Sequence, residues 1–146
     1  MGCVSRLPVL YDADCGFCRA TLGLLLAWDR RRRLRPIALQ DNEGEALLPG
    51  LTRDDRLATV RVLPAGEAPL AGGAAIARLL RELPGGVAAA LALERSPRLA
   101  EHAYRVVACN RSRLSPLIPG GLVRRADVLI RDRSASGLDG GTARRR

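Results

Sequence analysis

Short apolar runs alternate with longer amphipathic segments along the first half of the chain. Residues 7–11 and 34–39 are rich in Leu, Val and Ile and predict two buried strands. Pro36 in the second run suits an edge strand or the start of a strand, because proline has no backbone N–H to donate. Between the runs, apolar residues on two flanks predict a helix over residues 16–32 that packs against a sheet and is partly covered by neighbours.

The middle of the chain predicts smaller elements, followed by longer helices. Two short strand-like runs on either side of a turn indicate a β-hairpin. A Gly-Gly pair at 72–73 leads into apolar residues at helical spacing, and Pro-Gly-Gly at 84–86 ends that helix. The predicted elements are, in order, a short helix at 43–48, a turn at 53–57, strands at 59–63 and 68–71, and helices after 72–73, at 87–93 and from Ser96-Pro97 onward.

The last part of the chain carries loop signals. Pro116 and Pro-Gly-Gly at 119–121 follow Leu114, and residues 128–130 fit either a short strand or a loose segment. Residues 132–146 are rich in Gly, Ser and Arg and predict a disordered basic tail. We therefore expect a single domain over 1–146 with an ordered core of about residues 7–118.

The order of these elements predicts the fold class. Strand, helix, strand, short helix, hairpin and further helices fit an α/β domain with one central mixed sheet of about four strands, flanked by helices. A hairpin after the second crossover is the arrangement of a thioredoxin-like fold. The later helices would then be C-terminal additions to that fold.

The chain is strongly basic, with a formal net charge of +9 over 146 residues. All of the basic residues are arginine, which indicates codon bias in a GC-rich genome more than nucleic-acid recognition. Aromatic residues make up only 3% of the chain, so the interleaved stacking platform of a nucleic-acid binder is missing. We expect no nucleic-acid partner, and we keep as an alternative a basic interaction domain in which the C-x-x-C motif of Cys15 and Cys18, a possible redox motif, is vestigial.

No apolar run in the sequence is long enough to span a bilayer. The longest, residues 22–28, ends in Asp29 and four arginines. The N-terminus shows no secretory signal, so we expect a cytoplasmic protein without a membrane span. In that compartment a CxxC motif is more often catalytic or metal-binding than a permanent disulfide.

Two cysteines at the start of the first predicted helix carry the candidate chemistry. Cys15 and Cys18 are spaced i and i+3, which places both sulfurs on one side of the first helical turn. A disulfide could close and reopen there with little backbone movement. The positive end of the helix dipole favours a thiolate at Cys15, the form that attacks disulfides. The motif therefore predicts redox chemistry.

Two other interpretations of the motif remain open. The pair could be half of a zinc site, completed by Cys109 and His102 on a later helix. It could also be two buried cysteines that act as small apolar residues. We expect Cys109 itself in the core and no bound metal or cofactor.

Under the redox interpretation each nearby residue has a role. Cys15 is the nucleophile and Cys18 the resolving thiol that releases the mixed disulfide. Asp12 either accepts the proton of Cys18 during resolution or has only a structural role in the loop. Asp14 is mostly expected as the N-cap of the helix, with its carboxylate accepting a backbone N–H near residue 17. Arg19 either stabilises the thiolate or is an ordinary solvated arginine.

The chain resembles the DCC family of predicted thiol-disulfide oxidoreductases. The family's D-x-x-C-x-x-C motif corresponds to Asp12, Cys15 and Cys18 within "VLYDADCGFCRA", and "GGAAIARLLREL" and "AYRVVACNRSRL" are further matches. The resemblance covers residues 7–114. It implies a thioredoxin-like domain, protein disulfide oxidoreductase activity, a protein or small-molecule substrate that bears a thiol or disulfide, and an electron donor that it does not name.

Two departures from the expected pattern stand out. Ala13 follows the motif aspartate, where the family often has glycine. Thioredoxins proper also carry a cis-proline before the third strand, facing the disulfide. Ala58-Thr59 occupies that place in this chain.

Overall fold

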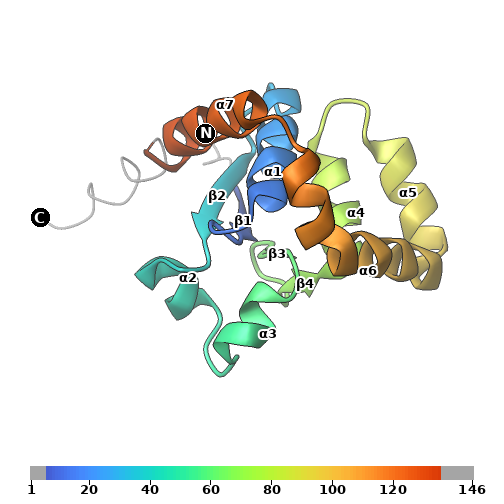
Figure 1. Ribbon diagram of the computed structural model, residues 1–146. Coiled ribbons are helices and arrows are strands. Elements are labelled where there is room, and N and C mark those ends of the chain that lie inside the picture. The colour runs from blue at the N-terminus through green and yellow to red at the C-terminus, as the bar shows by residue number, and fades with distance from the viewer. Residues whose placement is uncertain (1–5, 136–146) are drawn as a thin grey trace, which may run out of the picture.

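The computed structural model describes residues 6–135 and shows an α/β fold with one four-stranded sheet and seven α-helices in that range (Figure 1). The elements are β1 (Leu7–Tyr11), α1 (Gly16–Trp28), β2 (Leu34–Ala38), α2 (Asn42–Leu47), α3 (Arg53–Leu57), β3 (Arg61–Val62), β4 (Leu70–Ala71), α4 (Gly72–Glu82), α5 (Val87–Arg95), α6 (Pro97–Leu114), the 3₁₀ turn η1 (Ser115–Leu117) and α7 (Gly120–Ala135). This confirms the predicted thioredoxin-like class with added C-terminal helices.

The sheet is mixed, with strand order β2-β1-β3-β4. β1 and β2 are parallel, paired from Leu7 with Leu34 to Tyr11 with Ala38, because α1 crosses over between them. β3 runs antiparallel to both β1 and β4, as the predicted hairpin requires. β2 lies at one edge, where Pro36 is tolerated.

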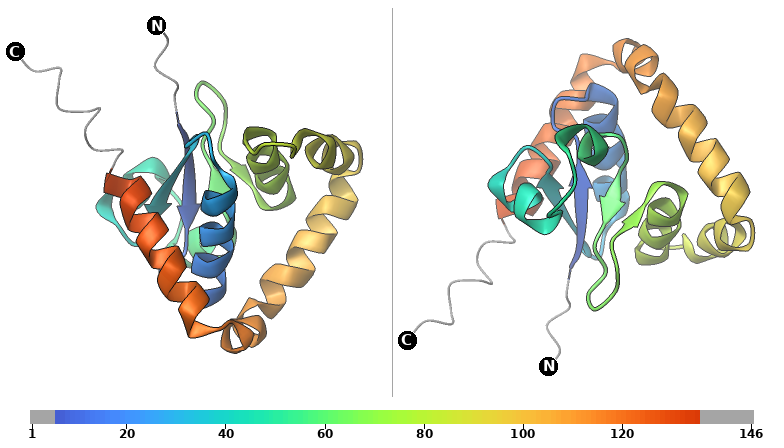
Figure 2. Two further views of the ribbon diagram at one scale, coloured as in Figure 1. Left: turned by 90° about the horizontal axis from the view of Figure 1, so that it is seen from above. Right: turned by 90° about the horizontal axis from the view of Figure 1, so that it is seen from below.

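Each face of the sheet has its own apolar core, because successive side chains of a strand point to opposite faces. On one face Val9 packs with residues of α1, α4 and α7, among them Leu26, Leu79 and Ile130. On the other face Leu10 packs with Ile37, Leu39 and Leu48 near α2 and α3. Figure 2 shows α1 and α7 on one side of the sheet and α2 and α3 on the other.

Helix α1 ends at Trp28, four residues before its predicted end at residue 32. The side chain of Asp29 accepts the backbone N–H groups of Arg33 at 3.0 Å and Leu34 at 2.9 Å. Arg32 has a φ of 51°, a left-handed conformation that an α-helix cannot contain. The chain therefore turns here and enters β2.

The largest difference from the sequence prediction lies at the C-terminal end. Residues 120–135 form helix α7, which lies along α1, so neither the strand nor the loose segment expected at 128–130 is correct (Figure 2). Helix α7 lies beyond residue 118, where the ordered core was expected to end. Of the predicted basic tail, residues 132–135 are helical, and residues 136–146 lie outside the described residues.

Close packing between small residues explains this helix. A Cβ atom added to Gly23 of α1 would lie 2.3 Å from the Cβ of Ala126 in α7, so only glycine permits this approach. Ala126 and Ile130 are buried in the contact. In the sequence, arginines separate the apolar residues of α7, and residues typical of loops precede them. The apolar stripe of this helix was therefore not recognised.

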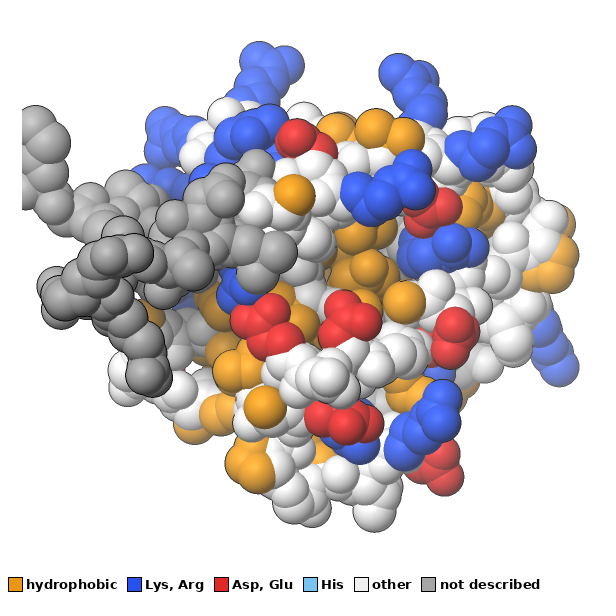
Figure 3. Space-filling model, turned by 90° about the vertical axis from the view of Figure 1, so that its left-hand side faces the viewer, with side chains coloured by type: hydrophobic (Ala, Val, Ile, Leu, Met, Phe, Trp, Pro, Cys, Tyr) orange, Lys and Arg blue, Asp and Glu red, His pale blue; other side chains and the backbone are white. Residues whose placement is uncertain are grey.

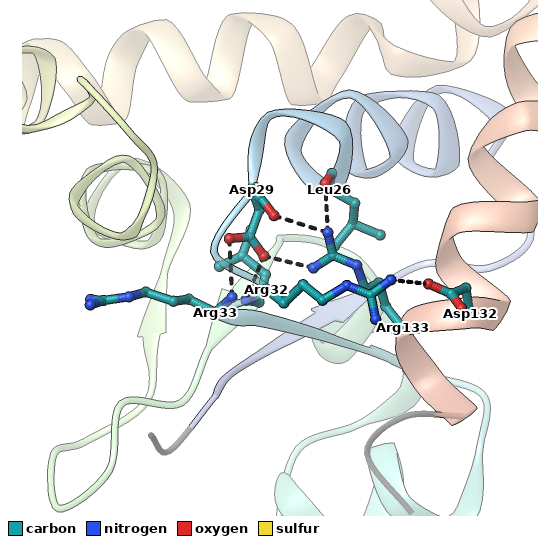
Figure 4. Close-up of polar contacts among 7 residues, drawn as sticks. Leu26, Asp29, Arg32, Arg33, Asp132 and Arg133 are labelled. Atoms are coloured by element: carbon teal, nitrogen blue, oxygen red, sulfur yellow. Dashed lines mark hydrogen bonds and ion pairs between the residues drawn. The ribbon is translucent and has the colours of Figure 1, made fainter. Parts of the chain in front are cut away.

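A buried ion pair joins the two helices beyond the apolar contact (Figure 4). Asp29 is fully buried and Arg133 is 6% exposed. Arg133 Nη1 lies 2.9 Å from Asp29 Oδ2, and Nη2 donates to the carbonyl oxygens of Leu26 at 3.1 Å and Asp29 at 2.9 Å. Arg133 thus donates to two of the carbonyl groups at the end of α1.

Across residues 6–135, no helix combines the length and the apolar character that a membrane crossing requires.

Candidate redox site

The turn between β1 and α1 places both cysteines at the first helical turn. Cys15 is the N-cap of α1, with extended backbone, and its Sγ accepts the backbone N–H of Cys18 at 3.3 Å. The prediction that Asp14 caps the helix is therefore wrong. Asp14 is exposed, and its backbone N–H donates to Asp12 Oδ1 at 3.0 Å. The helix begins at Gly16 as predicted, but Cys15 rather than Asp14 occupies the N-cap position.

The structure brings the two sulfurs together. Cys18 Sγ donates to Cys15 Sγ across 2.8 Å, and both cysteines are half-buried free thiols. The predicted i and i+3 spacing accounts for this proximity.

Burial is the main cause that raises the pKa of the Cys18 thiol, to about 12. The hydrogen bond to Cys15 and the negative charge of Cys15 raise that pKa further, and the charge of Asp12 adds a smaller increase. The positive charge of Arg111 opposes them and lowers it. Cys18 therefore keeps its proton at neutral pH.

Gln40, which the sequence interpretation missed, organises the loop before the cysteines. Its Nε2 donates to Asp12 Oδ1 at 2.7 Å and to Asp14 Oδ2 at 3.3 Å, and its Oε1 accepts the N–H of Ala13 at 3.1 Å. A signal for Gln40 was present. Gln40 lies two residues after the end of β2, and parallel neighbouring strands end at the same edge of the sheet.

Arg19 is paired away from the dithiol. Its Nη1 lies 3.2 Å and 3.3 Å from the two carboxylate oxygens of Asp127 in α7. The cation that lowers the pKa of Cys18 is instead Arg111 in α6. Arg111 is half-buried, and its Nη1 donates to the carbonyl of Leu57 at 2.9 Å. Only the "AYRVVACNRSRL" segment, which contains Arg111, could have indicated this residue.

The segment before β3 is held by Tyr104 of α6. The Tyr104 hydroxyl accepts the backbone N–H of Val60 at 2.8 Å and the hydroxyl of Thr59 at 2.9 Å. Thr59 Oγ1 also accepts the N–H of Gly72 at 3.1 Å. Within residues 6–135 there is no cis peptide bond, so Ala58-Thr59 does not reproduce the cis-proline of thioredoxins.

A cavity of about 340 Å³ lies beside the dithiol, between α1, α4, α6 and the sheet. Its wall is mainly aliphatic and includes Phe17, Leu25 and Ile76. Cys18, Asp12 and Arg111 are among the residues that supply polar groups to its lining. This volume is within the range of small-molecule sites in proteins.

Ser115 completes the start of α1 from a distant part of the chain. Its Oγ accepts the backbone N–H of Phe17 at 3.1 Å, one of the helix N–H groups that has no partner within α1. From the sequence, the carboxylate of Asp14 was expected in this role. No local pattern could show that η1, 98 positions later, supplies it.

The structure gives no support to the zinc alternative. In the described part of the chain, no group of three or more His, Cys, Asp or Glu side chains is placed to hold a metal ion. Cys109 is exposed, contrary to the expectation that it lies in the core, because it points away from the apolar side of α6. Cys3 lies outside the described residues.

The charged surface is mixed on the face that Figure 3 presents. Acidic side chains lie among the arginines there, and the basic groups do not form one continuous area. Several arginines are held in ion pairs, such as Arg32 with Asp132 at 2.8 Å and Arg35 with Glu43 at 2.8 Å. The basic interaction domain stays a prediction.

Comparisons with known proteins bear on the same residues. The model of a family described as DCC1-like thiol-disulfide oxidoreductase matches residues 9–116. No curated protein and no solved structure matches the chain. The matched range contains Asp12, both motif cysteines and Arg111, whereas α7 lies beyond it.

Proposed function

The chain belongs to the DCC1-like thiol-disulfide oxidoreductase family, and from that premise we propose that Cys15 and Cys18 perform thiol–disulfide exchange. The observation that carries this proposal is the placement of two free sulfurs 2.8 Å apart at the N-terminus of α1, next to a cavity that a substrate can enter. An exchange reaction needs this arrangement, because both sulfurs must reach one substrate sulfur in turn.

Cys15 is the attacking sulfur in the first step. A bond forms between Cys15 Sγ and one substrate sulfur, the substrate S–S bond breaks, and the other half leaves as a thiolate that takes a proton from solvent. The N–H of Cys18 donates to Cys15 Sγ, and the helix dipole adds positive potential at the same place. Both stabilise the negative charge on the sulfur that attacks.

Cys18 resolves the mixed disulfide in the second step. Its Sγ bonds to Cys15 Sγ, the bond from Cys15 to the substrate breaks, and the second half of the substrate leaves as a thiol. Formation of the mixed disulfide removes the charge of Cys15 and its hydrogen bond with Cys18, two of the causes that raise the pKa of Cys18. The resolving thiol thus loses its proton more easily once it is needed.

Asp12 is the proposed acceptor of the Cys18 proton. Its charge acts on Cys18, it lines the same cavity, and Gln40 and the backbone of Asp14 hold its carboxylate in place. A carboxylate at this position can pass the proton to solvent. We further propose that a dithiol donor in the cytoplasm re-reduces the resulting Cys15–Cys18 disulfide.

Three cysteine variants test the proposal. Reduced protein is mixed with bis(hydroxyethyl) disulfide, with dithiothreitol as the donor, and turnover is followed as the formation of oxidised dithiothreitol. We expect Cys15→Ser to abolish cysteine-dependent turnover. In the absence of dithiothreitol, Cys18→Ser should stop after one step and accumulate a mixed disulfide on Cys15, visible as an adduct by mass spectrometry. Cys109→Ser, a change at an exposed cysteine of α6, is the matched control and should keep full turnover.

The outcome that contradicts the proposal is turnover that neither motif variant changes. A redox titration of the pair against dithiol buffers provides a separate check. We expect one reversible two-electron transition in the unaltered protein and none in Cys15→Ser.

A further inference from the structure

We propose that the substrate is a small organic disulfide with an apolar body and an anionic group. This inference rests on the function proposed above. The apolar body would occupy the cavity beside Cys18, and the anionic group would face Arg111. Three observations carry the inference: the apolar cavity, the backbone near it whose N–H groups are already hydrogen-bonded, and the Arg111 side chain in its wall.

The cavity is too large to be an ordinary packing defect. Protein interiors are packed to the density of organic crystals and contain few voids larger than a water molecule. This one measures about 340 Å³, and most of its wall is aliphatic or aromatic, with Leu22, Leu25, Ile76 and Val107 among the lining residues. Water gains few hydrogen bonds in such a space, so an apolar ligand group is the better occupant.

The backbone near the dithiol does not offer a docking edge for an extended polypeptide. Peptides that add a strand need unpaired N–H and C=O groups. β3 lies between β1 and β4 in the sheet. The N–H groups of Val60 and Gly72 are taken by the side chains of Tyr104 and Thr59. A small molecule that enters the cavity needs none of these groups.

Arg111 gives the cavity its positive charge. Among the described residues that line the cavity, Arg111 is the only cation and Asp12 the only carboxylate. Asp12 already accepts hydrogen bonds from Gln40 and from the backbone of Asp14. The guanidinium of Arg111 makes one hydrogen bond, to the carbonyl of Leu57, and no ion pair within residues 6–135. Its remaining N–H groups suit a carboxylate.

The chemistry is the exchange described above, with the substrate named by class. Cys15 Sγ bonds to one sulfur of R–S–S–R, and the first R–S⁻ leaves and is protonated. Cys18 then bonds to Cys15 and releases the second half as R–SH. The protein dithiol loses two electrons, the substrate disulfide gains them, and one disulfide is reduced per dithiol consumed.

Four dialkyl disulfides test the proposal in single-turnover experiments with the reduced protein. They are dithiodipropionate and dithiodihexanoate, which are anionic with short and long chains, and bis(hydroxyethyl) and bis(hydroxyhexyl) disulfide, which are their neutral counterparts. Each rate is divided by the rate of the same compound with dithiothreitol, which removes differences in intrinsic reactivity. We expect the long anionic compound to react at least about tenfold faster than the short one, since each buried methylene favours binding.

Two tryptophan variants of α6 locate the effect. Ala103 lies on the cavity wall at an exposed position, so Ala103→Trp should remove the preference for long chains. Val106 is 51% exposed and does not line the cavity, so Val106→Trp is the matched control and should leave all four rates unchanged. Arg111→Met should bring the ratio of anionic to neutral rates, at equal chain length, close to one.

The outcomes separate this proposal from the proposed function. If no disulfide is reduced in a Cys15-dependent way, the oxidoreductase function itself fails. If all four are reduced but chain length has no effect, or if insulin disulfides are reduced faster than dithiodihexanoate, the function stands and the present proposal is overturned. The comparison of the four disulfides on the unaltered protein tests the proposal even if Ala103→Trp does not fold.

A binding measurement without turnover completes the test. Octanoate is titrated into the Cys15→Ser/Cys18→Ser protein by calorimetry. We expect saturable binding at one site, weakened by Arg111→Met or by Ala103→Trp. Absence of binding, or binding that neither change affects, would overturn the proposal.

Discussion

Helix α1 is packed in opposite ways by the two helices that follow it late in the chain. Against α7 it makes a dry and tight contact, with Gly23 against Ala126 and the ion pair of Asp29 with Arg133. Toward α6 it leaves a cavity of about 340 Å³, and α6 sends polar side chains, such as Tyr104 and Arg111, to the loops beyond it. Figure 2 shows α7 alongside α1 and α6 running away from it.

The two sides of α1 therefore differ in what they contribute: one side stabilises the fold, and the other borders the reactive sulfurs. On the α7 side, Gly23 packs against Ala126 and Asp29 pairs with Arg133, so substitutions there should mainly lower the free energy of unfolding. On the α6 side a cavity lies next to the sulfurs, so substitutions there should mainly alter the rate of thiol–disulfide exchange. The predictions below test whether this division is real.

The largest expected effect comes from the buried ion pair. Asp29→Asn leaves the charge of Arg133 buried without its partner, and we expect a loss of about 3–5 kcal/mol in the free energy of unfolding. Urea denaturation measures it. The matched control is Asp132→Asn, whose ion pair with Arg32 is about half exposed and should contribute at most about 1 kcal/mol. Equal losses for both variants would contradict the role assigned to the buried pair.

The next effect comes from the helix crossing. Gly23→Ala places a methyl group against the backbone of Ala126, and the overpacking should cost about 1–3 kcal/mol. Thermal unfolding of the purified variant tests this. Gly121→Ala, at an open position of α7 where the nearest atom lies 3.9 Å from the added Cβ, should be neutral or stabilising. A neutral Gly23→Ala would show that α1 and α7 are not tightly packed.

A smaller effect is expected at the start of α1, on the chemical side of the comparison. Ser115→Ala removes the acceptor for the N–H of Phe17 and should cost about 1 kcal/mol, as the loss of a helix cap does. Ser112→Ala, an exposed serine of α6, is the control and should change the urea midpoint little. If both substitutions have the same effect, the hydroxyl of Ser115 does not serve as a cap.

The smallest effect is a pH dependence that originates at Cys18. Its pKa is raised from 9.0 to about 12 in the folded protein, so the folded state keeps a proton that the unfolded chain loses above pH 9. This contribution to stability is complete below pH 9 and is lost as the pH rises toward 12. We expect a loss of a few tenths of a kcal/mol between about pH 8 and 9, read as the difference in urea midpoint between reduced wild type and Cys18→Ser. If the urea midpoints of the two proteins change with pH in the same way, the contribution of Cys18 is ruled out.

The sequence was most informative where structure depends on neighbours along the chain. The strands β1 and β2, the hairpin and the placement of Cys15 and Cys18 follow from short apolar runs, turn residues and an i, i+3 spacing. These features need no distant partner. Their signals therefore survive in the sequence alone.

The sequence failed where distant segments meet. Arg111, Ser115 and Arg133 each act on α1 from far along the chain, and each looked like an ordinary polar residue. Helix α7 was missed because Pro-Gly-Gly at 119–121 reads as a loop, although Gly120 begins the helix. Asp29 was assigned to a helix interior, whereas its side chain ends that helix.

The pairing of Asp29 with Arg133 also has a consequence for biosynthesis. The two residues are 104 positions apart, so Asp29 is synthesised long before Arg133. Until Arg133 is made, the carboxylate has the backbone N–H groups of Arg33 and Leu34 as partners but lacks its counter-charge, which opposes burial of the end of α1. We therefore expect the end of α1 to become buried only after residue 133 has been made, and chains stalled before that residue to be cut by protease near Asp29.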